Sequence, residues 1–454
     1  MGRFTDTVRT YKEFFRRVTK RDYSGYDGLA IRNYSYQLST NLVAKVGGLI
    51  YTIIIARMLM PELFGLYSLA LSTIFIFMAF SDLGVGDTVL RFISRELGRK
   101  NYTKAKSYFN YLFRLKIYIT LFATLLLLIS ARFISENYYH KPIFLALIAG
   151  CLYVIFTSFS SFLYSIAQSS NKFRGVFYKE SIFQFSRLIL IPTIIVLSVK
   201  TLVDPNKILF NIVIGLSFAS FITVVFLALY LRKEIKYLTG EPGSLSAKEK
   251  DKVKKFILAI SITSLCSIIS LYTDVFILGR FVSPEFIGNY TASLSLIGAA
   301  VPLITFSVAI APILNRLPRK KLEIFFRKIL AVSLVLSLVG FVFVFVLSDY
   351  IIKIIFGEEY VYASGILRIL CFLFFSMPLV QLYATYFIAI GKPFVITRLL
   401  VTFTAINIIL NFAIVSYLAG YSEISATYGA AFATSISGAI YLILLFITTR
   451  FNHS

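Results

Sequence analysis

The chain has 454 residues, of which 58% are hydrophobic and 15% charged, and its mean hydropathy is +0.80. Such an apolar composition leaves too few polar side chains to cover a soluble domain, and it indicates a membrane protein. The net charge of +24 is spread over many short segments, which argues against a single patch that binds nucleic acid.

The polar segments lack the motifs of hydrolytic and phosphoryl-transfer enzymes. They contain no HExxH, CxxC, GxxxxGK or GxSxG, and the whole chain has two histidines. Cys151, Cys266 and Cys371 each stand inside an apolar run, as small packed hydrophobic residues do. We therefore expect neither an enzyme nor a metal site, and no cofactor other than a coupling ion, Na⁺ or H⁺.

Twelve apolar stretches are long enough to cross a bilayer core of about 30 Å as helices. They lie at residues 36–57, 62–82, 110–131, 142–168, 176–199, 207–231, 255–279, 285–312, 325–348, 361–390, 393–418 and 424–449. Lipid offers the backbone no hydrogen-bonding partner, and the stretches are too long for barrel strands, so each must be helical. The predicted fold class is an all-α membrane protein with about 12 transmembrane helices.

The distribution of basic residues predicts the orientation of these helices. With the N-terminus inside, 36 of the 46 lysines and arginines fall on its side, 7 on the other side and 3 within spans. This bias places both termini in the cytoplasm of a multi-pass plasma-membrane protein. Residues 1–28 hold no apolar core, so no cleavable signal is expected. Residues 5–18 are either an interfacial amphipathic helix or a disordered tail.

Two 17-residue segments, 223 positions apart, resemble each other. Residues 56–72 read ARMLMPELFGLYSLALS and residues 279–295 read GRFVSPEFIGNYTASLS, with seven identities. Each predicts a helical hairpin, with an arginine at the negative end of one helix dipole and a proline in the first turn of the next helix. These residues are Arg57 and Pro61 in the first segment and Arg280 and Pro284 in the second. Local helix chemistry accounts for each hairpin but not for its recurrence.

The segments join spans 1 and 2 and spans 7 and 8, which indicates two parallel six-helix repeats. A weaker echo, YSIAQSSNK at 164–172 and YFIAIGK at 386–392, ends spans 4 and 10. Between the repeats lies a polar segment that carries glycine and proline. We expect a cytoplasmic N-terminal segment at 1–35, an N-lobe at 36–231, a cytoplasmic linker at 232–255, a C-lobe at 256–449 and a cytoplasmic tail at 450–454. Two such bundles with a cleft between them are typical of transporters.

These motifs carry a family resemblance. ARMLMPELFGLYSLALS followed by SDLGVGDTVLRFISREL, and later DVFILGRFVSPEFIGNYTASLS with APILNRL, resemble the polysaccharide biosynthesis flippases that move lipid-linked oligosaccharides. Those proteins share a superfamily, the multidrug/oligosaccharidyl-lipid/polysaccharide exporters, with multidrug extruders and lipid II flippases. The resemblance spans residues 30–449 and implies a V-shaped pair of six-helix lobes, alternating access and a polyprenyl-diphosphate glycan as substrate. The implied partners are this lipid, the bilayer and other polysaccharide-assembly proteins.

The first span carries polar residues on one helical face. Lys45 lies about ten residues into the span, hence about 15 Å deep, where a charge costs several kcal/mol unless it meets water or a partner. Gln37, Asn41, Lys45, Gly48 and Thr52 recur at steps of three or four. We expect this face to line a cavity and Lys45 to bind an anionic diphosphate, with Gln37 and Asn41 beside it. A structural Lys45 would instead pair with Asp82 or Asp274.

Three further residues are candidates for substrate binding. Arg187 is either a second cation for the diphosphate or an ion-pair partner of Glu180, with which it shares a helical face. Asp274 belongs to a second polar face with Thr263, Ser267 and Ser270, and it could gate the cavity, pair with a cation or bind a coupling ion. A helix break near Gly84 followed by an amphipathic helix would present Arg91 to an entering headgroup, unless Arg91 serves as a positive-inside anchor.

Three functions compete on these grounds. A flippase for a lipid-linked oligosaccharide is favoured, because cations inside the membrane suit an anionic lipid. A cation-coupled multidrug exporter is the alternative, although acidic residues would be expected in its cavity. A membrane-embedded glycosyltransferase or polymerase is disfavoured, because the predicted outer loops are short.

Overall fold

The computed structural model describes residues 25–451, apart from 236–240, 242, 306–309, 311–313 and 315–317. All regular structure in this part of the chain is helical, which confirms the predicted all-α class. The segment predicted at 5–18 lies outside the described residues.

The first repeat contains seven helical elements. They are α2 (Gly25–Asp82), α3 (Val85–Gly98), α4 (Tyr102–Arg132), the π-helix η1 (Phe133–Tyr139), α5 (Phe144–Ser169), α6 (Phe173–Thr201) and α7 (Pro205–Glu234). The second repeat follows the linker with α8 (Ala247–Phe281), α9 (Pro284–Ile304), α11 (Arg319–Ile355), α12 (Ala363–Leu370), α13 (Phe372–Ala389), α14 (Pro393–Ala419) and α15 (Glu423–Phe451).

Ten helices of the described chain are long and apolar enough to span a membrane. The first, Arg32–Gly98, contains two of the predicted spans, and the span predicted at 285–312 contains α9. Three helices start about eight to eleven residues earlier than predicted: α2 at Gly25, α4 at Tyr102, and α8 at Ala247, where Ser246 and Glu249 form a capping box. These polar first turns lie beyond the apolar stretches, so the hydropathy window did not include them.

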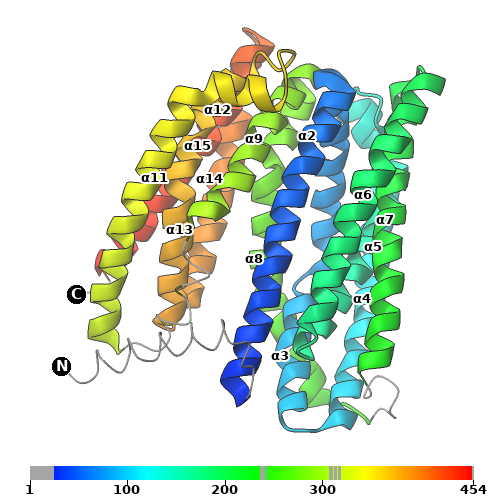
Figure 1. Ribbon diagram of the computed structural model, residues 1–454, viewed down its shortest axis with the longest axis vertical. Helices are drawn as coiled ribbons and strands as arrows, with labels where there is room; N and C mark the ends of the chain where they lie inside the picture. Colours follow the sequence, from blue (N-terminus) through cyan, green and yellow to red (C-terminus); the bar gives the residue numbers. More distant parts are fainter. Residues whose placement is uncertain are drawn as a thin grey trace.

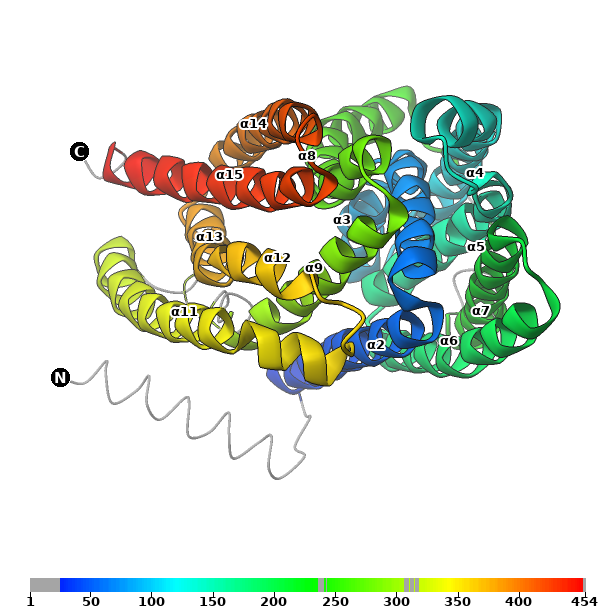
Figure 2. The ribbon, with the colours of Figure 1, turned by 90° about the horizontal axis from the view of Figure 1, so that it is seen from above.

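The helices form two bundles that meet along their middle. Helices α4–α7 lie on one side and α11–α15 on the other, while α2, α8 and α9 lie between them (Figures 1 and 2). We call the end that holds residues 57–61 and 280–284 the hairpin end. The opposite end, where α2 and α8 begin, is the linker end.

The apolar core is shared at the hairpin end and divided at the linker end. The largest cluster joins both repeats, for instance through Leu59 and Leu69 of α2 and Leu278 and Ile287 of α8 and α9. A second cluster draws on α3 to α7 and the first turns of α8, and a third on α11, α13, α14 and α15. The two bundles are therefore packed together at one end and separately cored at the other.

The repeated segment forms the contact between the lobes. A Cβ on Gly65 would lie 1.7 Å from the carbonyl oxygen of Pro284, and one on Gly288 would lie 2.1 Å from that of Pro61. Each glycine thus receives the proline carbonyl of the other hairpin, at a distance that any side chain would prevent. The recurrence of this segment follows from that reciprocal contact, which local helix chemistry could not reveal.

The arginines of the repeat also reach across the interface. The Nε of Arg57 donates to the carbonyl of Ile355 at the end of α11 at 2.8 Å, and Nη1 of Arg280 donates to that of Asn137 in η1 at 3.1 Å. Both therefore cap the last carbonyls of a helix in the other repeat. Arg280 also lies in the last turn of its own helix, as predicted.

Two further hydrogen bonds also join the two repeats, and their acceptor carbonyls occupy equivalent positions. The hydroxyl of Tyr360 donates to Ala56 at 2.7 Å, and Nζ of Lys141 donates to Gly279 at 2.5 Å. Ala56 and Gly279 are again 223 positions apart. The hairpin end is thus held by a pseudo-symmetric set of backbone contacts and hydrogen bonds between the lobes.

Candidate functional site

The predicted polar face of α2 runs along the linker half of that helix. Gln37 is half-buried, and Asn41 and Lys45 are exposed. Within the described part of the chain, Lys45 has no ion pair and no hydrogen bond from its side chain. The carboxylates considered as partners are engaged elsewhere: Asp82 with Lys116 and Asp274 with Tyr290.

Arg187 of α6 lies against the same face. Its Nη2 is 3.4 Å from the position of a Cβ on Gly48, one helical turn from Lys45, and its guanidinium stacks 4.4 Å from the ring centroid of Tyr51. The α2 glycine thus allows the guanidinium to approach. The two predicted cations therefore lie on neighbouring helices about one turn apart.

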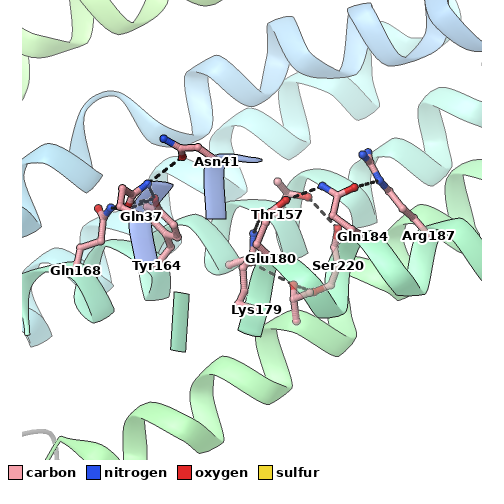
Figure 3. A network of polar contacts seen from close by, with 12 residues as sticks. Gln37, Asn41, Thr157, Tyr164, Gln168, Lys179, Glu180, Gln184, Arg187 and Ser220 are labelled. Atoms are coloured by element: carbon pink, nitrogen blue, oxygen red, sulfur yellow. Dashed lines mark hydrogen bonds and ion pairs between the residues drawn. The ribbon is translucent and has the colours of Figure 1, made fainter. Parts of the chain in front are cut away.

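A chain of polar contacts orients Arg187 (Figure 3). Its Nε donates to Oε1 of Gln184 at 2.9 Å, and Nε2 of Gln184 donates to Oε1 of Glu180 at 2.6 Å. The other Glu180 oxygen pairs with Lys179 at 3.3 Å. Gln184 therefore stands between Arg187 and Glu180, the ion-pair partner considered from the sequence.

A second polar group lies beside this chain, between α2 and α5. Nε2 of Gln37 donates to Asn41 at 3.0 Å and to the hydroxyl of Tyr164 at 3.2 Å. Nε2 of Gln168 donates to Gln37 at 3.1 Å and to Tyr164 at 2.9 Å. Tyr164 and Gln168 were not predicted as site residues. The sequence did hold a signal for Gln168. When YSIAQ of the first repeat is aligned with YFIAI of the second, the glutamine corresponds to an isoleucine.

Arg91 is placed apart from both groups. The helix break occurs at Leu83 and Gly84, both with positive φ, as the sequence predicted, and the amphipathic α3 follows. Arg91 is exposed, and its guanidinium lies 4.3 Å from the ring centroid of Phe256 in α8. The same turn is held by Ser261, which donates to the Leu83 carbonyl at 3.0 Å.

Lys116 lies within the span predicted at 110–131 but was not selected as a site residue. It lies in α4, wholly buried, and donates to the carbonyl of Ser81 at 2.8 Å and to Asp82 at 3.0 Å. Its ion pair holds the end of α2 where the chain turns into α3.

In the C-lobe, Asp274 lies at the centre of a buried polar cluster. Its Oδ2 accepts from the hydroxyls of Tyr290 at 2.6 Å and Thr434 at 2.7 Å. Asn407 and Asn411 join this cluster through Thr434, and three of its buried oxygens, Oδ1 of Asp274, Asn407 and Asn411, have no partner in the described chain. Such orphaned acceptors are costly unless a ligand or water meets them.

The rest of the second polar face turns toward α14. Thr263 donates to Thr397 at 3.3 Å, and Ser270 lies 3.5 Å from the hydroxyl of Thr404. These residues therefore join two helices of the C-lobe.

The two lobes carry opposite charges in equivalent regions, although not at the same positions. Tyr67 bonds Tyr51, 16 residues before it, and Tyr290 bonds Asp274 at the same spacing. Counted from the helix N-caps, Lys172 and Lys392, Arg187 occupies the position of Asn407. The N-lobe thus has a guanidinium where the C-lobe has a carboxylate and amide oxygens.

Comparisons with known proteins agree with this architecture. A family model described as polysaccharide biosynthesis protein matches residues 30–318. The chain belongs to this family. The resemblance predicted from the motifs is confirmed. A search of curated proteins finds no match.

Solved structures show the same fold. One described as lipid II flippase MurJ in an inward closed conformation has a TM-score of 0.70 and 17% identity, covering 92% of this chain and 87% of that chain. An inward-facing MATE family transporter of the MOP superfamily has a TM-score of 0.67 and 14% identity, covering 89% and 94%. An outward-facing one has a TM-score of 0.58 and 16% identity, covering 94% and 95%. The protein is a multi-pass membrane protein with the two-repeat fold of these transporters.

Proposed function

We propose that the protein is a flippase that moves a polyprenyl-diphosphate-linked oligosaccharide from the cytoplasmic to the outer leaflet. The observation that carries this proposal is the position of Lys45 and Arg187 on neighbouring helices, with neither in an ion pair within the described chain. Two cations at membrane depth are costly unless an anionic ligand or water compensates them. A diphosphate offers both charge and the paired oxygens that a guanidinium binds well.

Alternating access is the mechanism that suits the lobes. They share one core at the hairpin end, whereas at the linker end α11 and α13–α15 have a core of their own and the N-lobe core includes only the first turns of α8 from the second repeat. The basic residues favour a cytoplasmic linker end, so this conformation would receive substrate from the cytoplasm. The TM-scores with the inward closed lipid II flippase and the inward-facing MATE transporter are both higher than that with the outward-facing MATE transporter, which supports an inward conformation. Arg91, on α3 at the linker end, would then meet an entering headgroup first.

The buried C-lobe cluster suits a coupling cation, Na⁺ or H⁺. A carboxylate and two amide oxygens without partners form an oxygen-only donor set of the kind that hard cations prefer. Asp274 would supply the charge, and Asn407 and Asn411 would supply neutral oxygens. The cation would bind in the C-lobe, whereas the diphosphate would bind in the N-lobe.

A cation-coupled multidrug exporter remains the second candidate, since MATE transporters share the fold. Its supporting observation is Asp274, a carboxylate inside the membrane. Asp274 is, however, 2% exposed and hydrogen-bonded, whereas the exposed charge on α2 is a lysine. The positive charge of Lys45 would repel a cationic drug.

The test of the flippase is transport of a fluorescent polyprenyl-diphosphate sugar by protein reconstituted into vesicles. Lys45→Ala should abolish flipping while leaving the protein folded, because the loss of a midplane charge lowers the insertion cost by about 2.5–3.5 kcal/mol. Lys45→Arg should keep part of the activity, and Lys45→Glu should be worse than alanine. Lys200→Ala, an exposed lysine at the end of α6, is the control. Normal flipping by Lys45→Ala would refute the assignment, and export of cationic drugs without flipping would favour the second candidate.

The cation site is tested through stability. Wild-type protein should melt at a higher temperature in NaCl than in choline chloride if Na⁺ binds the folded state, and Asp274→Asn should lose this difference. Asp349→Asn, an exposed carboxylate in α11, should keep it. If neither Na⁺ nor a change of pH distinguishes Asp274→Asn from the wild type, in melting or in flipping, Asp274 does not bind the coupling ion.

A further inference from the structure

We propose that Gln37, Asn41, Tyr164 and Gln168 form a subsite for the sugar that is attached to the diphosphate. The inference rests on the proposed function, because it concerns the substrate of the same site. The four side chains come from α2 and α5 and lie beside the Arg187 chain (Figure 3). We call them the amide cluster.

The amide cluster has the donors and acceptors that sugar hydroxyls need. It contains three amides and one phenol, each able to donate and accept. Within the described chain, Nδ2 of Asn41 and Oε1 of Gln168 have no protein partner. The remaining groups bond one another at 2.9 to 3.2 Å, which holds the free donor and acceptor in place. Asn41 is exposed and the other three are half-buried, so a ligand has access to them.

The position of the cluster suits the first sugar of a lipid-linked glycan. Gln37 and Asn41 stand eight and four residues before Lys45 on one face of α2, hence about 12 and 6 Å along the axis at 1.5 Å per residue. A sugar joined to a diphosphate at Lys45 would reach this distance. The cluster lies on the linker-end side of Lys45, from which the glycan would enter.

The second repeat supplies an internal control. At the 223-residue offset, Ile260 takes the place of Gln37 and Ile268 that of Lys45, and in the echo Ile390 takes the place of Gln168. Ile260 packs against the Gly84 turn. The equivalent helices therefore pack with apolar side chains at these positions. Packing therefore does not require an amide at positions 37 and 168, so Gln37 and Gln168 point to a ligand, whereas Asn41 and Tyr164 have polar counterparts in Ser264 and Tyr386.

The chemistry of the cluster selects a neutral, hydroxylated ligand. The cluster itself carries no charge, whereas a diphosphate favours cations such as Lys45 and Arg187. An isoprenoid chain would leave Nδ2 of Asn41 and Oε1 of Gln168 without partners, which costs free energy. The ring of Tyr164 adds an apolar surface next to its polar hydroxyl, and pyranose rings have both kinds of surface.

The experiment compares binding of bare undecaprenyl diphosphate with that of the same lipid carrying N-acetylglucosamine, glucose or galactose. Native mass spectrometry of the full-length protein in detergent gives the dissociation constants. Gln37→Ile and Gln168→Ile introduce the residues of the second repeat, and Thr193→Val, whose hydroxyl bonds only its own helix in the described chain, is the control. Wild-type protein should bind at least one sugar-bearing lipid more tightly than the bare one. Each isoleucine variant should reduce this preference about tenfold, as expected for the loss of about two hydrogen bonds, without changing affinity for the bare lipid.

Two outcomes would overturn the subsite. One is a wild-type protein that prefers none of the sugar-bearing lipids, and the other is an equal loss of affinity for bare and sugar-bearing lipids in the isoleucine variants. Failure of the proposed function is distinct, because it would appear as no binding of any of the four lipids. Lys45→Ala should weaken all four together.

Discussion

Replacing Gly65 by alanine should separate the two lobes at the hairpin end. The added Cβ would lie 1.7 Å from the Pro284 carbonyl oxygen and 2.9 Å from the Gly288 nitrogen, where ordinary contact begins at 3.4 Å. The backbones must therefore move apart by about 1.7 Å, since no flexible side chain can give way. Overpacking of this kind costs about 1–3 kcal/mol, which shifts a two-state equilibrium by about 5–150-fold.

The assay is disulfide formation between cysteines placed at Met60 and Ser283, which precede the two prolines, after replacement of the three native cysteines. The pair should form readily with Gly65 present and much less with Gly65→Ala or Gly288→Ala. Gly298→Ala is the control, because a Cβ there meets nothing within 4 Å. Equal cross-linking and equal flipping by all variants would show that the glycine contact does not set the distance between the lobes.

Three other predictions concern separate parts of the molecule. Asp82→Asn should lower the melting temperature by leaving the buried Lys116 unpaired, at a cost of about 3–5 kcal/mol, and the added Lys116→Met should restore it; an additive loss would contradict the pairing. Burial lowers the pKa of Lys141 from 10.5 to about 8, so between these values the unfolded chain binds more protons, and stability should rise with pH more in the wild type than in Lys141→Met. A cysteine at Ser283 should react with an impermeant thiol reagent outside sealed cells and one at Ser244 should not, and the reverse pattern would invert the predicted orientation.

The sequence predicts the spans well because apolar length and helix-end residues are local properties. The break near Gly84 and the proline at the start of α9 were predicted on those grounds, and the structure has both. The reciprocal contact of Gly65 and Gly288 could not be predicted from the sequence, because it depends on how two hairpins that are distant in the chain pack together. The burial of Lys116 was missed for a related reason, because its partner Asp82 belongs to another helix.

The arrangement of the candidate residues could be predicted only in part. Lys45 and Arg187 were selected separately as charges within spans. The sequence could not show that their helices are neighbours, with Gly48 leaving room for the guanidinium of Arg187. Tyr164 and Gln168 were missed because polar residues near the end of a span are common. A position-by-position comparison of the two repeats would have singled out Gln168, because the second repeat has Ile390 at the corresponding position.

The equivalence of Tyr51 and Asp274 shows what a single fused chain permits. In a symmetric dimer of one half, the same side chain would stand on both sides of the axis, so both sides would carry the same charge. Joining the halves in one polypeptide lets each copy diverge while the shared tyrosine partners, Tyr67 and Tyr290, keep their hydrogen bonds. The two halves can then differ in charge, as the Arg187 group of the N-lobe and the Asp274 cluster of the C-lobe do.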